Sequence, residues 1–279
     1  MSLTGMLTDS LLGPVIIRAL IVGALVSVCA ALLGVNLVLK RHSMIGDGLS
    51  HVGFFALAVS SAAAFTAEFS LEISVVIVVA AAFLIQNLSN NGKMGGDAAI
   101  AMFSTGAVAL GVIIYDFTTG MTTDVCANMF GSSSVITLTN KDLIISVGLC
   151  AVVLLLFILF YNRIFSYTFD EEFAVSSGIR VTLYKTLISL LVSVTIVLGM
   201  KMMGAIMISA LVIFPALTSM RICKSFKGVV ICSASVSLVC FIIGFFISCA
   251  ASLQTGPTVI CINILAFIVF SVISKLKGR

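Results

Sequence analysis

Residues 229–250 read VVICSASVSLVCFIIGFFISCA, a run of 22 residues without one charged side chain. An α-helix needs about 20 mainly apolar residues to cross the hydrocarbon core of a bilayer. Backbone polar groups must be satisfied within such a segment, so this run predicts a transmembrane helix. Eight other runs are similar, and the nine predicted spans cover about residues 15–39, 45–65, 71–88, 98–115, 143–161, 183–199, 203–220, 229–250 and 257–273.

The composition of the whole chain supports a membrane protein. Of the 279 residues, 61% are hydrophobic and 9% are charged, whereas a soluble domain has about 25% charged residues. The runs lack the alternation of a transmembrane β-barrel. We therefore predict an all-α, polytopic membrane helix bundle of about nine helices, forming one transmembrane domain over residues 1–279. The joint at 198–204 is short, and a re-entrant unit there would leave eight to ten helices possible.

Charged residues divide the predicted connections into two alternating sets. Basic residues dominate one set and acidic residues the other. Because basic loops stay in the cytoplasm, this division predicts an outside N-terminus and a cytoplasmic C-terminus. The basic set contains Lys40, Arg41, Lys93, Arg163, Arg180, Lys185, Arg221, Lys224, Lys227, Lys275, Lys277 and Arg279, and the other set contains Asp9, Glu68, Glu72, Asp116, Asp124, Lys141 and Asp142.

Asp47 and His51 open the second predicted span. They are four residues apart, so a helix places both on one face. Ionisable groups in membrane helices are costly and usually functional. A carboxylate oxygen with an imidazole nitrogen suits zinc or manganese better than calcium or copper(I). The alternative is structural: Asp47 caps the helix and His51 hydrogen-bonds a neighbouring helix.

One chain offers only two such ligands, which is too few for tight metal binding. Weak coordination suits transport, because the ion must leave again. A symmetric dimer would bring two copies of Asp47 and two of His51 to one axis, which gives four ligands.

A polar stretch between the fifth and sixth predicted spans forms a second constellation. Thr168 or Asp170 can cap a short helix there, and Gly178 can end it. Phe169 and Phe173 are four residues apart and would form one apolar knob beside acidic residues. Such a knob is typical of a docking element for a partner. The alternative is an ordinary linker along the membrane surface.

Two signatures are absent from the sequence. It contains neither the G-x-x-x-x-G-K-[ST] nucleotide motif nor the H-E-x-x-H motif of zinc proteases. We therefore predict no nucleotide site and no enzymatic activity in this chain.

Pro215 lies inside the seventh predicted span, where it should kink the helix and is a possible gate.

Several motifs resemble those of a known family. The stretch RHSMIGDGLSH at 41–51 looks like the signature of the ABC-3 permeases, the membrane subunits of bacterial zinc, manganese and iron ABC importers. Residues 130–132, 168–174 and 209–216 resemble three further family segments in the same order. The resemblance implies a multi-pass protein of the bacterial cytoplasmic membrane. It also implies a homodimer, a cytoplasmic ATP-binding subunit that hydrolyses ATP, and an extracellular metal-binding protein, with no nucleic acid involved.

The resemblance also assigns residues. It implies that Asp47 and His51 line the ion path, and that a cytoplasmic coupling segment at about 162–185 contacts the ATPase. The coupling residues are Phe169, Asp170, Glu171, Phe173, Ala174 and Gly178.

The chain departs from the family pattern at two positions, and two stretches bear on the transported metal. Gly48 stands where many relatives have Ala or Thr, and Glu171 where many have Pro. The variants at 168–171 and 216–221 look more like the zinc branch, so Zn²⁺ is the predicted cargo. The alternatives are a manganese or iron importer of the same family, or a proton-coupled secondary metal transporter.

Overall fold

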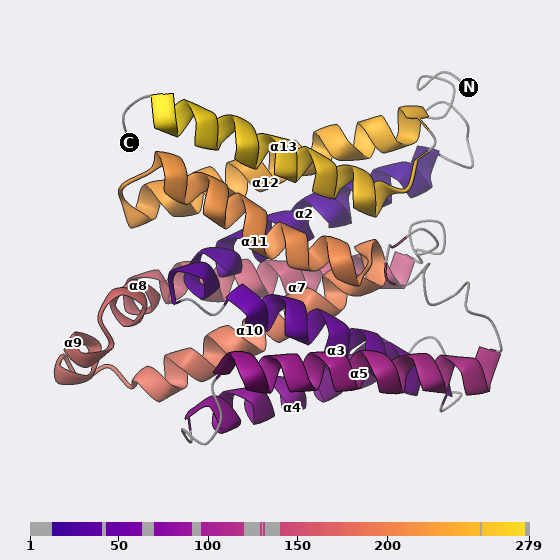
Figure 1. The fold of residues 1–279 in the computed structure, drawn as a ribbon, viewed down its shortest axis with the longest axis horizontal. Helices are drawn as coiled ribbons and strands as arrows, with labels where there is room; N and C mark the ends of the chain where they lie inside the picture. The colour runs from indigo at the N-terminus through magenta and orange to yellow at the C-terminus, as the bar shows by residue number, and fades with distance from the viewer. Residues whose placement is uncertain are drawn as a thin grey trace.

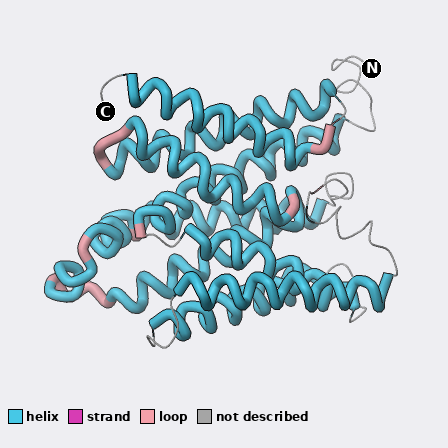
Figure 2. Tube along the Cα trace, viewed as in Figure 1, coloured by secondary structure: helices cyan, strands magenta, loops and turns pink. Residues whose placement is uncertain are grey.

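The described part of the chain is all-α, as the sequence predicts. The computed structural model describes residues 13–40, 43–62, 70–90, 96–119, 129, 131, 140–251 and 253–276, and no strand occurs among them (Figure 2). They form α2 (Gly13–Leu39), α3 (Ser43–Ala62), α4 (Ser70–Asn90), α5 (Gly96–Thr119), α7 (Asn140–Leu159), α8 (Tyr161–Phe169), α9 (Glu171–Ser176), α10 (Val181–Met203), α11 (Ala205–Ile222), α12 (Phe226–Ala251) and α13 (Thr255–Leu276).

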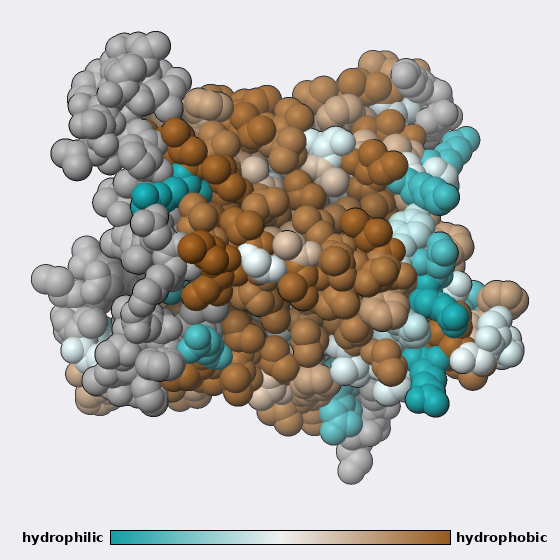
Figure 3. Space-filling view, turned by 180° about the vertical axis from the view of Figure 1, so that it is seen from behind, coloured by the Kyte–Doolittle hydropathy of each residue, from teal (hydrophilic) through white to brown (hydrophobic). Residues whose placement is uncertain are grey.

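The long helices lie roughly along one common direction, and successive helices run in opposite senses (Figure 1). The short helices α8 and α9 lie at the end of the bundle where α2 and α13 finish. From behind, a broad apolar surface covers the middle of the molecule, and polar residues gather at that same end (Figure 3). This distribution suits a protein that crosses a bilayer.

Six described helices are long and apolar enough to cross a membrane, namely α2, α5, α10, α11, α12 and α13. A seventh span is possible if α7 and α8, which meet at 67°, count together. The apolar part of α4, Glu72–Leu88, is shorter, and α3 carries Asp47 and His51. The prediction of about nine spans is thus confirmed only as a polytopic bundle with six to seven candidate spans.

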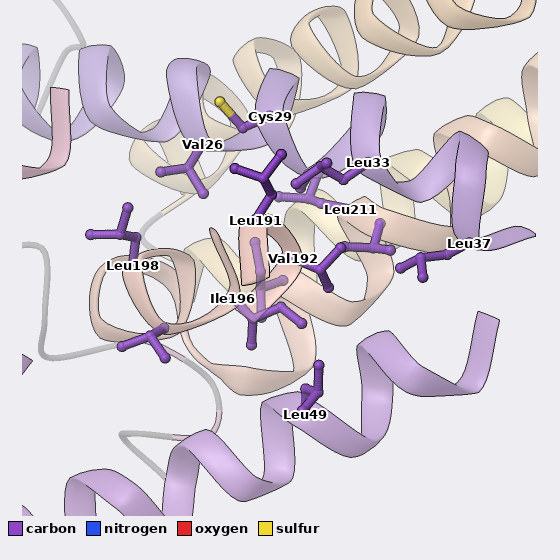
Figure 4. Close-up of a cluster of buried hydrophobic side chains, with 14 of the residues drawn as sticks. Val26, Cys29, Leu33, Leu37, Leu49, Leu191, Val192, Ile196, Leu198 and Leu211 are labelled. Atoms are coloured by element: carbon purple, nitrogen blue, oxygen red, sulfur yellow. The ribbon is translucent and has the colours of Figure 1, made fainter. Parts of the chain in front are cut away.

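Helix α2 forms the centre of the core. Its buried residues Val26 and Leu33 face Leu191 and Ile196 of α10, and Leu49 of α3 lies nearby (Figure 4). On its other sides α2 contacts α11, α12 and α7. Helix α2, which precedes the helix that carries Asp47, is therefore held on several sides by buried apolar contacts.

The joint between α10 and α11 is a single glycine. Gly204 has a φ of 90°, a conformation that favours glycine because it has no Cβ. Each helix is apolar enough to be a span by itself, and the two run in opposite senses from this turn (Figure 1). Gly131, also at positive φ, packs against the backbone of Met203 and Gly204. Its neighbours Phe130 and Ser132 of the predicted outer-loop motif lie outside the described residues.

Gly34 of α2 packs directly against the backbone of α11, and this contact gives a stability prediction. A Cβ at this position would collide with the carbonyl oxygen of Val212. Small residues let membrane helices approach in this way. We expect Gly34→Ala to destabilise the chain by about 1–3 kcal/mol, as overpacking does, because a backbone carbonyl cannot rotate away.

Gly106 of α5 is the matched control, since a Cβ added there would meet no other atom within 4 Å. Gly106→Ala should leave stability unchanged or raise it slightly. The measurement is thermal unfolding in detergent followed with a thiol-reactive dye, because the chain has eight cysteines and no Trp. Equal unfolding temperatures for the two variants would contradict the close contact of α2 with α11.

Candidate functional site

Asp47 and His51 lie in the first half of α3. The helix begins at Ser43, four residues before Asp47, so the alternative that Asp47 caps the helix is wrong. Helix α3 packs against α4 and α5 and also against α11. This packing fixes the position of both side chains within the bundle.

The two side chains face one another. Nε2 of His51 lies 3.7 Å from Oδ2 of Asp47. The His51 side chain is 20% exposed and that of Asp47 is 47% exposed, so the carboxylate still has a free approach. The buried Nδ1 of His51 has no hydrogen-bond partner among the described residues. The alternative that this nitrogen bonds a neighbouring helix therefore finds no support.

Among the described residues no third His, Cys, Asp or Glu joins the pair to form a possible metal group. Zinc sites in proteins usually have at least three protein ligands. One copy of the described chain therefore supplies an incomplete site that is open on the Asp47 side.

Gly48 brings α3 close to α5. A Cβ there would lie 2.5 Å from Cγ2 of Ile100, which is buried. Ile100 thus occupies the space that a larger side chain at position 48 would need.

The segment that the family resemblance implies to be the coupling segment has the predicted local fold at Asp170 and Gly178. Oδ1 of Asp170 accepts a hydrogen bond of 2.9 Å from the backbone N–H of Phe173, which makes Asp170 the N-cap of α9. At the other end Gly178 has a φ of 77°. The N–H of Ile179 donates to the carbonyl of Ala174, which completes a Schellman motif.

The two phenylalanines do not form the predicted knob on one helix. Asp170 separates them, because it ends α8 and begins α9. The Phe169 ring packs against Phe165 and Phe226, with ring centroids 5.0 and 5.8 Å away. Phe173 on α9 is 61% exposed. The apolar surface at this end of the bundle is thus built from two helices.

Comparison with known proteins decides the family. Residues 13–274 match the ABC 3 transport family. The chain belongs to this family. As a membrane subunit of that kind, this permease is a multi-pass membrane protein and is not itself catalytic.

The names of the relatives of this permease specify different metals. The manganese import system permease protein ScaB of Streptococcus gordonii is 27% identical over 253 residues, covering 90% of this chain and 88% of the relative. The high-affinity zinc uptake system membrane protein ZnuB of Haemophilus influenzae is also 27% identical, over 255 residues, covering 91% and 95%. Equal identity to both leaves the predicted zinc branch without support from these comparisons.

A solved structure shares the architecture. A chain in the structure "PsaBC from Streptococcus pneumoniae in complex with Fab" superposes with a TM-score of 0.84 and 25% identity, covering 98% of each chain. A putative metal-chelate type ABC transporter in an inward-facing conformation shows the same fold with a TM-score of 0.74 at 15% identity.

The permease also has contacts that sequence reasoning missed. Nζ of Lys40, at the end of α2, lies 3.2 Å from Oε2 of Glu171 and 4.2 Å from the centre of the Tyr167 ring. One turn earlier, Oδ1 of Asn36 lies 3.2 Å from the hydroxyl oxygen of Thr168. These contacts connect α8 and α9 to the end of α2, three residues before α3 begins. Because the partners are more than 130 positions apart, no local pattern could reveal them.

Pro215 lies buried inside α11. Its ring nitrogen has no hydrogen, so the carbonyl of Leu211 lacks the usual helical donor. Helix α11 packs against α2, α3 and α13. A change in α11 would therefore reach α3, the helix that carries Asp47 and His51.

Proposed function

We propose that this permease is the membrane subunit of an ATP-driven importer of a divalent metal ion. The observation that carries the proposal is the Asp47–His51 pair, with 3.7 Å between oxygen and nitrogen, on a helix of a membrane bundle. The names of the relatives, which specify manganese or zinc uptake, support the same substrate class. Because the sequence lacks a nucleotide motif, a separate cytoplasmic subunit hydrolyses ATP. An extracellular binding protein delivers the metal.

The metal site is shared by two copies of the chain. Asp47 is half exposed, although a bare carboxylate facing lipid is costly. A second copy would cover it and add its own Asp47 and His51, so the two copies together supply four ligands. A homodimer thus completes the site and removes the carboxylate from lipid.

The orientation follows from charge. The end of the bundle that carries α9 is also where α2, α11 and α13 end and where α10 and α12 begin (Figure 1). These helix ends carry Lys40, Arg180, Lys224 and Lys275. The positive-inside rule makes this end cytoplasmic. We infer nine spans, counting α3, α4 and α7 with the six apolar helices, with the N-terminus outside and the C-terminus in the cytoplasm.

The coupling segment contacts the ATPase through its exposed apolar and acidic surface. Phe169 and Phe173 are 59% and 61% exposed, and Glu171 is half exposed beside them. Movement of α9 is transmitted through Lys40 to α2 and α3. Helix α11 bends at Pro215, which acts as a gate. The metal is then held at Asp47 and His51 and released inward by alternating access. The inferred ATPase contacts are Phe169, Asp170, Glu171, Phe173, Ala174 and Gly178.

Zinc remains our prediction for the cargo, from the variants at 168–171 and 216–221. The test is metal accumulation in bacteria that lack their own permease and produce this chain with its ATPase and binding protein. We expect labelled zinc to accumulate and excess manganese to compete only weakly. Accumulation of manganese without zinc would overturn the zinc assignment. Uptake that persists without the ATPase would instead support a proton-coupled transporter.

A further inference from the structure

A pocket of about 60 Å³ opens between α2, α4, α5, α8 and α10. Its lining residues Lys40, Tyr167 and Lys185 lie at or near the end of α2, the end of α8 and the start of α10, so the pocket lies toward the end of the bundle that carries α9. Of α3 only Ile45 reaches it, and neither Asp47 nor His51 is among its lining residues. The pocket is therefore separate from the proposed metal site. Its volume is several times the minimum of about 10–15 Å³ that a cavity needs to hold one water molecule, so the pocket can admit a small polar group.

The polar lining of this pocket suits an anion. Lys40 enters it from α2 and Lys185 from α10. Gln86, Tyr167 and Ser189 add groups that can donate hydrogen bonds. No carboxylate is among the described lining residues, although Glu171 reaches Lys40 from outside the pocket. Two cations in a lining whose other described residues are neutral, and mostly apolar, favour a negatively charged ligand.

Asn36 adds a second, independent observation. It is only 2% exposed, it lines the pocket, and its Nδ2 has no hydrogen-bond partner among the described residues. Buried polar groups in proteins nearly always have a partner. A ligand in the pocket would supply one for this amide.

We propose that the pocket binds a phosphate-bearing anion. Basic pockets between transmembrane helices on the cytoplasmic side bind the headgroups of anionic lipids, and inorganic phosphate offers the same chemistry. The assignment of a lipid headgroup as the ligand rests on the proposed orientation of the bundle in the membrane, whereas the binding of a phosphate group does not. Because Lys40 also contacts Glu171 and Tyr167, the anion sits directly beside the segment proposed to touch the ATPase.

The test uses the full-length chain with its ATPase, in nanodiscs of phosphatidylcholine that contain some phosphatidylglycerol. Native mass spectrometry measures which lipid remains bound. We expect preferential retention of phosphatidylglycerol, reduced about fivefold by Lys185→Gln, in line with the contribution of one lysine near an anionic lipid. Lys185→Arg should retain the preference. Lys224→Gln is the matched control, since it removes an exposed charge at the same end of the bundle.

A second arm separates the two sources of phosphate. Inorganic phosphate is added to the detergent-purified complex at constant ionic strength, and thermal unfolding is measured. Stabilisation by phosphate that Lys185→Gln abolishes supports a site for the free ion, and lipid retention that the same substitution abolishes supports the headgroup. The proposal is overturned if neither effect occurs, or if Lys185→Gln and Lys224→Gln behave alike. Metal uptake measured in parallel shows whether the transport function stands independently of this outcome.

Discussion

Asp47→Asn should lower metal uptake at least about tenfold, because it removes the charge of a ligand while preserving its shape. Even residues that only support a metal ligand change affinity by about 10- to 100-fold when substituted. His51→Gln should have a similar effect, since it removes the imidazole nitrogen that faces Asp47 at 3.7 Å. The measurement is accumulation of labelled metal in cells that lack their own permease, at matched expression.

Asp97→Asn is the control for this prediction. Asp97 is an exposed carboxylate in the first turn of α5 and is not part of the pair. The Asp97→Asn substitution should leave metal uptake near that of the unaltered permease. Near-normal uptake by both Asp47→Asn and His51→Gln would rule out a role for the pair in the ion path.

Phe173→Ala should uncouple the ATPase from the permease. The ring is 61% exposed on α9, so its removal leaves the stability of the permease within about 0.5 kcal/mol. Aromatic anchors at protein interfaces contribute about 2 kcal/mol or more, which corresponds to at least about thirtyfold in affinity. We therefore expect a large loss of metal-stimulated ATP hydrolysis in the assembled complex at limiting ATPase concentration.

Phe117→Ala provides the matched control. Phe117 is 87% exposed, but it lies near the end of α5, at the opposite end of the bundle from α9 (Figure 1). The same truncation there should leave ATP hydrolysis unchanged. Equal stimulation in the Phe173 and Phe117 variants would show that α9 is not the docking element.

Local patterns predicted local structure well. The uncharged run at 229–250 lies within α12, and Asp170 and Gly178 begin and end α9 as their chemistry requires. These features depend on residues a few positions apart, so hydropathy and capping preferences are sufficient to find them. The joint at 198–204 could not be resolved in the same way, because a left-handed φ at Gly204 is a property of the folded backbone.

These local patterns could not predict the tertiary contacts. The spacing of Phe169 and Phe173 suggested one helix face, but the same Asp170 that caps α9 ends α8. The pocket formed by Lys40, Lys185 and Asn36 brings together α2 and α10, which are distant in sequence. The pairing of Asp47 with His51 was predictable because both lie on one helix, whereas the second copy that we propose to complete a metal site with them belongs to no local pattern.

The most direct test of the shared site is X-ray absorption spectroscopy of the metal-loaded permease complex together with metal analysis. We expect one metal ion per two copies of the chain, with imidazole nitrogen and carboxylate oxygen among its ligands. His51→Gln should remove the imidazole signature. A metal shell that lacks imidazole, or one that His51→Gln leaves unchanged, would contradict the account.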